Sequence, residues 1–273
     1  MPLSNQDNTE SSDTHSISQK FVEARHTHTG LAEYPGTIPN DLHTAYEIQS
    51  LAIGAWNDTI AGWKVGGVPP DYQQQFDEKR LAGPIFSKAV KHCRDEQHVD
   101  MPIFVDGYAA VEAEFVIELG DISELPTTDL SLDQVKLAIS RVFIGIEIAS
   151  SPLQIINDIG PVGPISDFGN NNGLIVGPEI VNWQKHDLSK YKVTVYINDE
   201  HIGTTSAKPD LDGPLGAVKF LIEHLRQHKY DIPKGTLVST GAITGVHQAF
   251  VKAKSRVIFD GLGSMNITLV PSN

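Results

Sequence analysis

One run of nine residues restricts the fold of this chain more than any other segment, because apolar and acidic side chains alternate along it. Positions 111, 113, 115, 117 and 119 are all apolar, whereas Glu112, Glu114 and Glu118 share the other positions with Val116. Side chains of a β-strand point alternately to the two faces of a sheet, so this period predicts a strand with one wholly apolar face. The fold must therefore provide an apolar layer against that face.

More strands than helices are predicted after residue 60. Short apolar stretches predict strands at 60–65, 103–105, 142–149, 174–176, 191–197, 237–240, 255–259 and 265–270, and helices at 131–140 and 214–228. Their irregular order lacks the repeating strand–helix–strand rhythm of a parallel α/β fold. Neither a dinucleotide-binding glycine motif nor a Walker loop is present. The predicted class is α+β.

The pattern divides the chain into three regions. Residues 1–15 are polar with a single Leu, and such a stretch cannot bury enough apolar surface to offset its ordering entropy, so we expect a mobile polar tail. Residues 16–60 show helical periodicity at 16–27 and at about 40–58, which predicts a small helical N-terminal region. Residues 61–273 are predicted to form a catalytic β-rich core.

The composition excludes several classes of protein. The 273 residues include 21 Lys and Arg against 34 Asp and Glu, for a net charge of −13, which argues against nucleic acid and anionic membranes as partners. The single cysteine, Cys93, excludes an internal disulfide and a Cys-rich zinc site. No apolar run is long enough to span a bilayer, and the N-terminus lacks the layout of a signal peptide. We expect a cytoplasmic protein.

Three acidic residues are candidate metal ligands. The Cα atoms of Glu112 and Glu114 lie roughly 7 Å apart in a strand, so their carboxylates can converge on one cation, although a solvated strand face would also explain them. Glu147 is the one acid in an apolar strand, and a buried carboxylate there needs either a metal or an Arg or Lys partner. Three oxygen ligands suit Mg²⁺ or Mn²⁺ and not zinc.

Two further segments can carry chemistry. Lys64 stands among small and apolar residues before Gly66 and Gly67, where proximity to a cation would lower its pKa and suit it to acid–base work. A lysine stem that runs along the strand to solvent is the alternative. Thr240 and Gly241 follow a strand at a glycine-rich turn whose hydroxyl and backbone N–H groups can bind an anion. A plain exit from the strand is the alternative there.

Taken together, these segments resemble the fumarylacetoacetate hydrolase superfamily, and within it the 2-keto-4-pentenoate hydratases and 4-oxalocrotonate decarboxylases. The matching motifs occur in family order across about residues 40–270, at 62–66, 83–86, 111–114, 145–148, the loop around Asp167, 240–242 and 261–264. The resemblance implies a mixed β-roll-like core with a smaller helical N-terminal region, in a protein that assembles as a homo-oligomer.

The resemblance also implies the roles of individual residues. Mg²⁺, with Mn²⁺ as the alternative, would be held by three acids, Lys64 would be the catalytic residue, and three further residues would contact the substrate. The ligands map to Glu112, Glu114 and Glu147, and the substrate contacts to Thr240, Gly241 and Asp167. Glu as the third ligand favours the hydratase and decarboxylase branch over the hydrolases, whose His–Glu dyad has no equivalent in this chain.

The implied activity is that of a lyase from the catabolism of aromatic compounds. A hydratase would add water to a small anionic 2-hydroxy-2,4-dienoate and give a 4-hydroxy-2-oxo acid. The alternatives are a 2-oxo-dioate decarboxylase, a C–C hydrolase of acylpyruvate or fumarylacetoacetate type, and an inactive 2-oxo-acid binding protein. One departure bears on this choice: Leu81 stands where hydratases often carry an Asp expected to help proton transfer.

Overall fold

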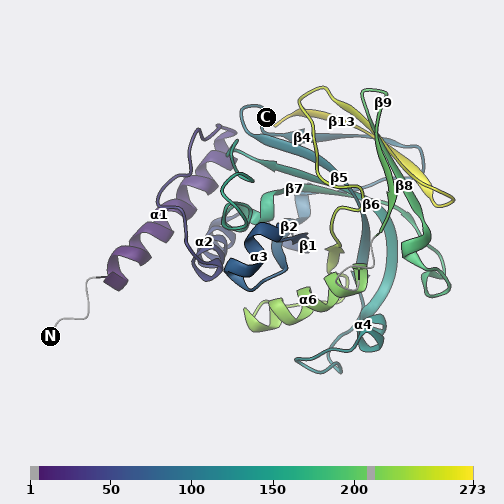
Figure 1. The fold of residues 1–273 in the computed structure, drawn as a ribbon, viewed down its shortest axis with the longest axis horizontal. Coiled ribbons are helices and arrows are strands. Elements are labelled where there is room, and N and C mark those ends of the chain that lie inside the picture. Colours follow the sequence, from purple (N-terminus) through teal and green to yellow (C-terminus); the bar gives the residue numbers. More distant parts are fainter. Residues whose placement is uncertain (1–5, 208–212, 273) are drawn as a thin grey trace.

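Two β-sheets make up most of the computed structural model, which describes residues 6–207 and 213–272 (Figure 1). The larger sheet has the strand order β2-β1-β10-β5-β6-β7-β3, and β11 also pairs with β5. In chain order its strands are β1 (Ile60–Gly67), β2 (Arg80–Phe86), β3 (Val90–His92), β5 (Tyr108–Leu119), β6 (Ile139–Ser151), β7 (Asn171–Glu179), β10 (Leu237–Ser239) and β11 (His247–Gln248). The strand predicted from alternation is therefore β5, in the middle of the larger sheet.

The smaller sheet has five strands in the order β4-β13-β12-β8-β9. They are β4 (His98–Ile103), β8 (Lys192–Ile197), β9 (Glu200–Ser206), β12 (Lys254–Phe259) and β13 (Gly263–Pro271). The pairs β1–β10, β3–β7 and β4–β13 are parallel, and the other pairs, such as β5–β6, are antiparallel. The predicted mixed α+β class is thus confirmed.

The two sheets pack against each other through the apolar face of β5. Every apolar side chain on that face is buried, and Phe115 meets Phe259 of β12 with ring centroids 5.7 Å apart. Val257, Met265 and Ile267 of the smaller sheet belong to the same buried cluster. The main core therefore lies between the sheets, as the alternating pattern requires.

The opposite face of β5 is enclosed as well, because the larger sheet curls until its edge strand β2 comes against β7. Inside this curl Val116 packs in a second cluster with Ile85, Phe143, Leu174, Val176 and Leu237. The acids of β5 at positions 112 and 114 share this inner side and are buried. A solvated strand face, the alternative explanation of these acids, is therefore excluded.

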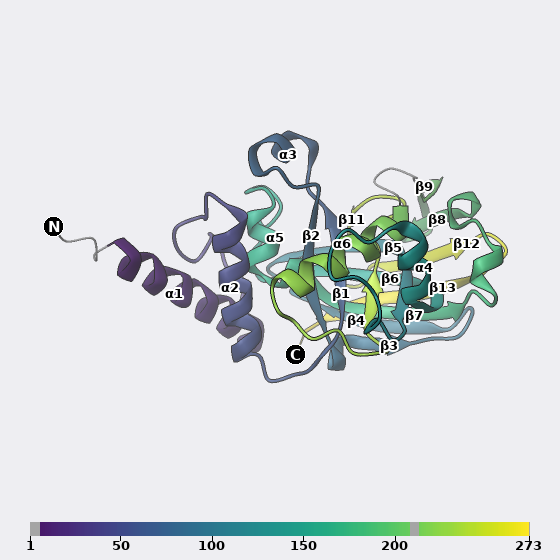
Figure 2. The same ribbon diagram turned by 90° about the horizontal axis from the view of Figure 1, so that it is seen from below.

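Helices occupy the margins of the sheets. They are α1 (Gln6–Thr27), α2 (Leu42–Ala55), α3 (Pro70–Phe76), α4 (Leu132–Ala138), α5 (Val162–Ser166) and α6 (Gly213–Gln227), with 3₁₀ turns η1 (Ser87–Ala89), η2 (Phe168–Asn170), η3 (Trp183–Lys185) and η4 (Leu188–Lys190). Figure 2 shows α1 and α2 side by side at one end of the molecule, beyond the strands. Phe21 of α1 and Ile48 of α2 pack there against Ile156, which joins the helical region to the sheet domain.

The helix α1 begins ten residues before the predicted start, at Gln6 and not at residue 16. Residues 6–15, expected in a mobile polar tail, are therefore helical, whereas residues 1–5 lie outside the described part of the chain. Thr14 is buried and donates a hydrogen bond to Glu47 of α2 at 3.3 Å. Contact with a neighbouring helix, which composition cannot reveal, accounts for the difference.

The strand β2 was not expected from the sequence. It contains Gly83 and Pro84, two residues that are unfavourable inside a sheet. It is nevertheless an edge strand that pairs only with β1 among the described strands, and an edge tolerates proline. Within the described ranges no helix combines the length and the apolarity needed to cross a membrane.

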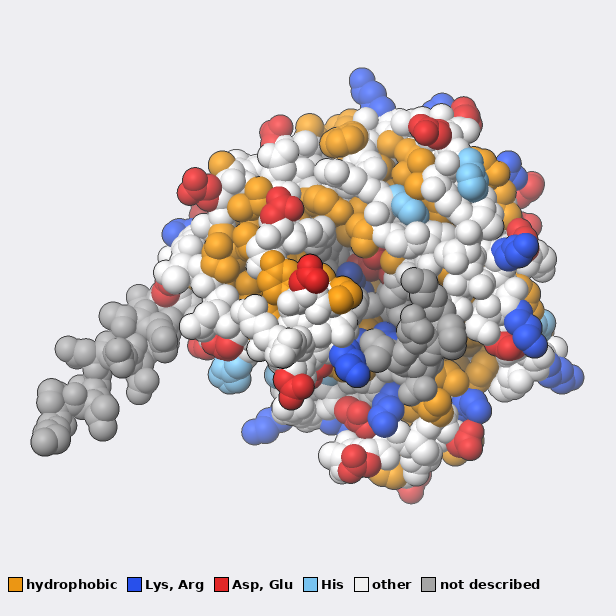
Figure 3. Space-filling view, in the orientation of Figure 1, with side chains coloured by type: hydrophobic (Ala, Val, Ile, Leu, Met, Phe, Trp, Pro, Cys, Tyr) orange, Lys and Arg blue, Asp and Glu red, His pale blue; other side chains and the backbone are white. Residues whose placement is uncertain are grey.

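Acidic and basic side chains are interspersed over the face of the molecule drawn in Figure 3. The net charge of −13 is therefore not gathered into one acidic patch on this face. The three candidate ligands Glu112, Glu114 and Glu147 are buried and contribute little to this surface.

Candidate metal centre

Strand register brings three glutamates together. Glu112 of β5 lies opposite Glu147 of β6, and Glu114 lies opposite Gly145. One carboxylate oxygen from each glutamate can be chosen so that all three lie within 4.8 Å of one another. The three side chains are buried, with Glu114 and Glu147 at 0% exposure. A buried cluster of three acids on two adjacent strands is what the alternating pattern and the lone Glu147 lead one to expect.

Burial makes this cluster electrostatically unfavourable without a cation. Loss of solvent raises the pKa of Glu112 to about 7, although Lys64 opposes this, and the charge of Glu147 adds to it. The pKa of Glu114 is raised well above its ordinary value by burial and then by the charges of Glu147 and Glu112. A divalent cation would stabilise all three ionised carboxylates together.

The hydrogen bonds around the cluster fix one oxygen each of Glu114 and Glu147. Ser239 and the backbone N–H of Gly241 donate to Glu114 Oε2, the latter at 2.9 Å. Asn171 Nδ2 donates to Glu147 Oε1 at 2.9 Å. Among the buried side-chain atoms of the described residues, Glu114 Oε1 and Glu147 Oε2 accept no hydrogen bond. The residues therefore fit a hard divalent cation bound by carboxylate oxygens.

Lys64 of β1 lies beside these acids. Its side chain is buried, and its Nζ lies 3.4 Å from Glu147 Oε2. Burial alone would lower the pKa of Lys64, but the charges of Glu147, Glu112 and Glu114 outweigh it and raise the pKa. The lowered pKa expected from the sequence is thus absent in the cation-free site. A divalent cation bound by the glutamates would add two positive charges beside Lys64 and would lower its pKa, in the direction expected from the sequence.

An apolar side chain lies near Lys64 in addition to the acids. A Cβ atom on Gly66 would lie 3.2 Å from Leu81 Cδ1 and 3.5 Å from Lys64 Nζ, so both side chains reach the space over this glycine. Leu81 is 4% exposed. The position that hydratases often fill with Asp is therefore an apolar wall next to the lysine.

Thr240 and Gly241 line a cavity of about 460 Å³, together with Arg80 of β2. The Thr240 hydroxyl donates to the Phe115 carbonyl at 2.9 Å, which fixes its orientation. Gly241 has a φ of +103°, a conformation that favours glycine, and its N–H bonds Glu114 as described. This turn thus joins the cavity to the acid cluster. A substrate contact at these two residues remains a prediction.

Asp167, the third predicted substrate contact, is engaged elsewhere. Its buried carboxylate forms an ion pair with Arg25 of α1 and accepts a hydrogen bond from Ser151 Oγ at 2.6 Å. The geometry gives Asp167 protein partners, and a role in substrate binding stays an untested prediction.

Sequence reasoning missed three residues that support the site. Ser239 lies inside the segment predicted to bind an anion, but its bond to Glu114 depends on the pairing of β10 with β5. Asn171 begins β7, in a segment whose sequence indicates only a loop. Arg25 lies in the last turn of α1, and nothing in the sequence shows that this cation is buried.

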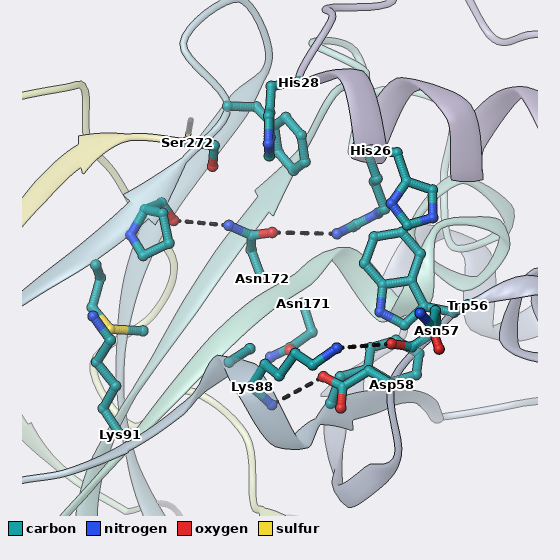
Figure 4. A pocket seen from close by; sticks show the side chains of 16 residues that line it. His26, His28, Trp56, Asn57, Asp58, Lys88, Lys91, Asn171, Asn172 and Ser272 are labelled. Carbon is teal, nitrogen blue, oxygen red and sulfur yellow. Dashed lines mark hydrogen bonds between the residues drawn. The ribbon is translucent and has the colours of Figure 1, made fainter.

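A second cavity, of about 540 Å³, opens beside two of these supporting residues, Arg25 and Asn171 (Figure 4). It is lined by Arg25, Trp56, Lys88, Asn171 and Asn172, among others. Figure 4 shows the Asn172 amide between two hydrogen bonds, which join it to the Pro102 carbonyl at 2.8 Å and to Arg25 at 3.4 Å.

Comparisons with known proteins bear on the family and the fold of this chain. The sequence model of the fumarylacetoacetate (FAA) hydrolase C-terminal family matches residues 63–270. The structure is similar to 4-oxalocrotonate decarboxylase from Pseudomonas putida G7, solved with calcium and acetate (TM-score 0.75) and with magnesium and adipate (TM-score 0.77). In both cases the identity is 20%, over 95% of this chain and 98% of the other.

A fumarylpyruvate hydrolase from Pseudomonas aeruginosa in complex with Mn²⁺ and pyruvate is also similar. Its TM-score is 0.56 at 15% identity, and the match covers 77% of this chain and 89% of the hydrolase. At these identities the solved structures bear on the fold alone.

Proposed function

The chain belongs to the fumarylacetoacetate hydrolase C-terminal family, and on that premise we propose that it is a metal-dependent lyase that acts on a small 2-oxo acid. Of the two lyase reactions open to it, we favour decarboxylation of a 2-oxo-dioate of the 4-oxalocrotonate type. The observation that carries this choice is the buried Leu81 beside Lys64.

The three glutamates would hold the cation. Glu112, Glu114 and Glu147 converge, and Ser239 and Asn171 fix one oxygen each of Glu114 and Glu147. The other oxygen of Glu114 accepts no hydrogen bond, and the other oxygen of Glu147 faces Lys64 Nζ at 3.4 Å. When bound, a divalent cation supplies Lewis-acid stabilisation of negative charge on the C2 oxygen of a 2-oxo acid. The similar decarboxylase structures contain calcium or magnesium with small carboxylates, which supports a ligand of this class.

Lys64 is the one buried cation beside the acids within the described residues, and it would serve as the proton donor. In decarboxylation the electron pair of the breaking C–C bond moves through the conjugated double bond to the C2 oxygen, and CO₂ leaves. No proton moves while that bond breaks, and a single protonated group can then supply the proton that the product takes up. The neighbouring glutamates raise the pKa of Lys64 and so keep it protonated, and a bound cation would lower that pKa toward the range in which the ammonium can give up its proton.

Hydration of a 2-hydroxy-2,4-dienoate is the second candidate. This reaction also develops negative charge on the C2 oxygen and could use the same lysine. It also requires protons to be moved to a chain carbon and away from the attacking water. Leu81 offers no group for this second transfer. An apolar wall also excludes water, which favours loss of a carboxylate over addition of water.

The experiment compares two substrates on one preparation. Protein stripped with EDTA receives 2-oxohex-3-enedioate or 2-hydroxypenta-2,4-dienoate, with and without Mg²⁺, while CO₂ release and loss of diene absorbance are followed. We expect Mg²⁺-dependent CO₂ release, and loss of that activity in Glu112→Gln. Turnover without metal, or full activity in the variant, would contradict the proposal.

Other outcomes distinguish the remaining activities. Turnover of the dienoate alone would favour the hydratase, and cleavage of an acylpyruvate would favour the C–C hydrolase. Calorimetric binding of a 2-oxo acid without any product would favour an inactive binding protein.

A further inference from the structure

A buried ion pair joins the N-terminal helix to the turn that precedes Asn171, the residue that donates to Glu147. Arg25 of α1 precedes residues 63–270, the part of the chain that matches the family. Its side chain is 4% exposed, and its Nη2 donates to Asp167 Oδ2 at 2.9 Å. Its guanidinium also lies over the Phe168 ring, 5.0 Å from the centroid. Because desolvation of such a pair offsets much of its Coulomb energy, stability alone is a weak reason for its presence.

The same guanidinium contacts both ends of the segment 167–172. Beyond the carboxylate of Asp167, it donates to the Asp167 carbonyl at 3.4 Å and to Asn172 Oδ1 at 3.4 Å. It also donates to the carbonyl of Ser150, near the end of β6, at 3.2 Å. Arg25 thus ties this segment to the strand that carries Glu147.

The segment has a conformation that needs such support. Phe168, Gly169 and Asn170 have φ values of +53°, +67° and +61°, so three consecutive residues are left-handed. This conformation is unfavourable for residues with a Cβ atom, and it persists only where surrounding contacts fix it. Phe168 packs against Trp56 and Phe86, and the polar contacts at the start of the turn come from Arg25 and from Ser151, which also donates to Asp167.

Asn171 follows this left-handed turn directly and donates to Glu147 Oε1 at 2.9 Å. From these contacts we propose that Arg25 is a positioning residue for Glu147, acting through Asp167, the turn 168–170 and Asn171. The proposal rests on the proposed metal site. It means that the helical N-terminal region affects cation affinity through these contacts, although no residue of α1 is one of the three acids.

The test measures Mn²⁺ binding by calorimetry, so that affinity and stoichiometry are obtained separately from activity. The variants are Arg25→Met, Asn171→Ala and the double variant, with Arg141→Met as the matched control. Arg141 also forms an ion pair and stacks on an aromatic ring, at 4.6 Å from Phe143 on β6, but its side chain is 47% exposed and it does not contact the segment 167–172.

We expect Asn171→Ala and Arg25→Met each to weaken Mn²⁺ affinity by about 10- to 100-fold, the range for loss of a residue that orients a metal ligand. Because both residues act on the same metal ligand, the Mn²⁺ affinity of the double variant should equal that of the single variant with the lower affinity. Arg141→Met should bind Mn²⁺ as the wild type does. The proposal would be overturned if Arg25→Met bound Mn²⁺ at full stoichiometry with unchanged affinity. It would also be overturned if the fold loss of affinity in the double variant were the product of the two single losses.

A second variant decides the case in which Arg25→Met folds poorly and its stoichiometry falls. Arg25→Lys keeps the buried charge but cannot reach Asp167 and Asn172 at once. It should bind at full stoichiometry with weakened affinity, and wild-type affinity in this variant overturns the inference. A wild-type protein that binds no Mn²⁺ would instead overturn the proposed function itself.

Discussion

At the scale of single residues, the identity of one apolar side chain decides which chemistry the site favours. The side chains of Leu81 and Lys64 both reach the space over Gly66, which has no Cβ atom to fill it. Neither residue could be placed beside the other from the sequence alone, because β2 itself was not expected. The resemblance identified the position, and the structure shows that it is buried and next to the lysine.

Leu81→Asp tests this reasoning. A carboxyl group beside Lys64 would add a second group for proton transfer, so the ratio of dienoate hydration to CO₂ release should rise, by roughly tenfold or more. Product analysis by NMR gives both rates, and Leu81→Asn controls for polarity without a titrating group. If the ratio of hydration to CO₂ release were similar in the Asp and Asn variants, the prediction that Leu81 blocks a second proton transfer would be contradicted.

Arg80 supports a prediction about the substrate tail. It lines the cavity with Thr240 and Gly241, and its Nη2 donates to the Gly213 carbonyl at 3.2 Å. We expect Arg80→Met to raise KM for a 2-oxo-dioate about tenfold, because a second carboxylate loses a cationic partner. KM for a 2-oxo acid with one carboxylate should change little. Equal changes in both KM values would contradict this reading of the cavity.

At the scale of elements, alternation predicted β5 and its apolar face, because a period of two reports directly on which side chains share a face. The same pattern could not show that the acidic face is enclosed. That enclosure depends on the curl of the larger sheet and on the approach of β2 to β7, both of which arise from contacts between distant segments.

Phe115→Ala tests the packing of β5. The side chain is fully buried against Phe259, so the substitution leaves a cavity between the sheets and should lower the free energy of unfolding by about 3–5 kcal/mol. Denaturant titration followed by circular dichroism measures this. Phe250→Ala is the matched control, because Phe250 is 71% exposed and should change stability by less than about 0.5 kcal/mol.

Gly83→Ala tests the crossing of β2 over the left-handed turn. A Cβ atom there would lie 2.4 Å from the Phe168 carbonyl oxygen and 2.5 Å from Gly169, so backbone must move. We expect a loss of about 1–3 kcal/mol in the free energy of unfolding. Because a Cβ on Gly169 would in turn meet the Lys64 stem at 3.1 Å, activity should fall further than stability explains. Gly67→Ala is the control, with no atom within 4 Å of the added Cβ.

At the scale of the whole molecule, acid clustering links stability to pH and to metal. Burial raises the pKa of Glu112 to about 7 and that of Glu114 further above its usual value. The folded protein therefore binds more protons than the unfolded chain at pH values above about 4.5, the ordinary pKa of Glu. Stability gained from these groups is present below that pH and is lost as the pH rises through their folded pKa values.

The metal-free protein should accordingly melt several degrees lower at pH 8 than at pH 5. Addition of Mg²⁺ should recover this loss at pH 8 and have little effect at pH 5, because the cation competes with protons for the carboxylates. Differential scanning calorimetry at both pH values provides the measurement. In Glu114→Gln the pH dependence should be smaller and the effect of Mg²⁺ largely lost. A Tm that rises from pH 5 to pH 8 without metal would contradict the reasoning.

The parallel pairing of β1 with β10 has a consequence for the order in which the chain can fold during synthesis. Lys64 lies beside Ser239 in that pairing, so the first strand of the larger sheet gains this neighbour only after most of the chain has left the ribosome. Arg25 likewise meets Asp167, 142 residues later in the sequence. The helical N-terminal region is made first but becomes fixed late, and a nascent chain of 200 residues still lacks the strand that orients Glu114.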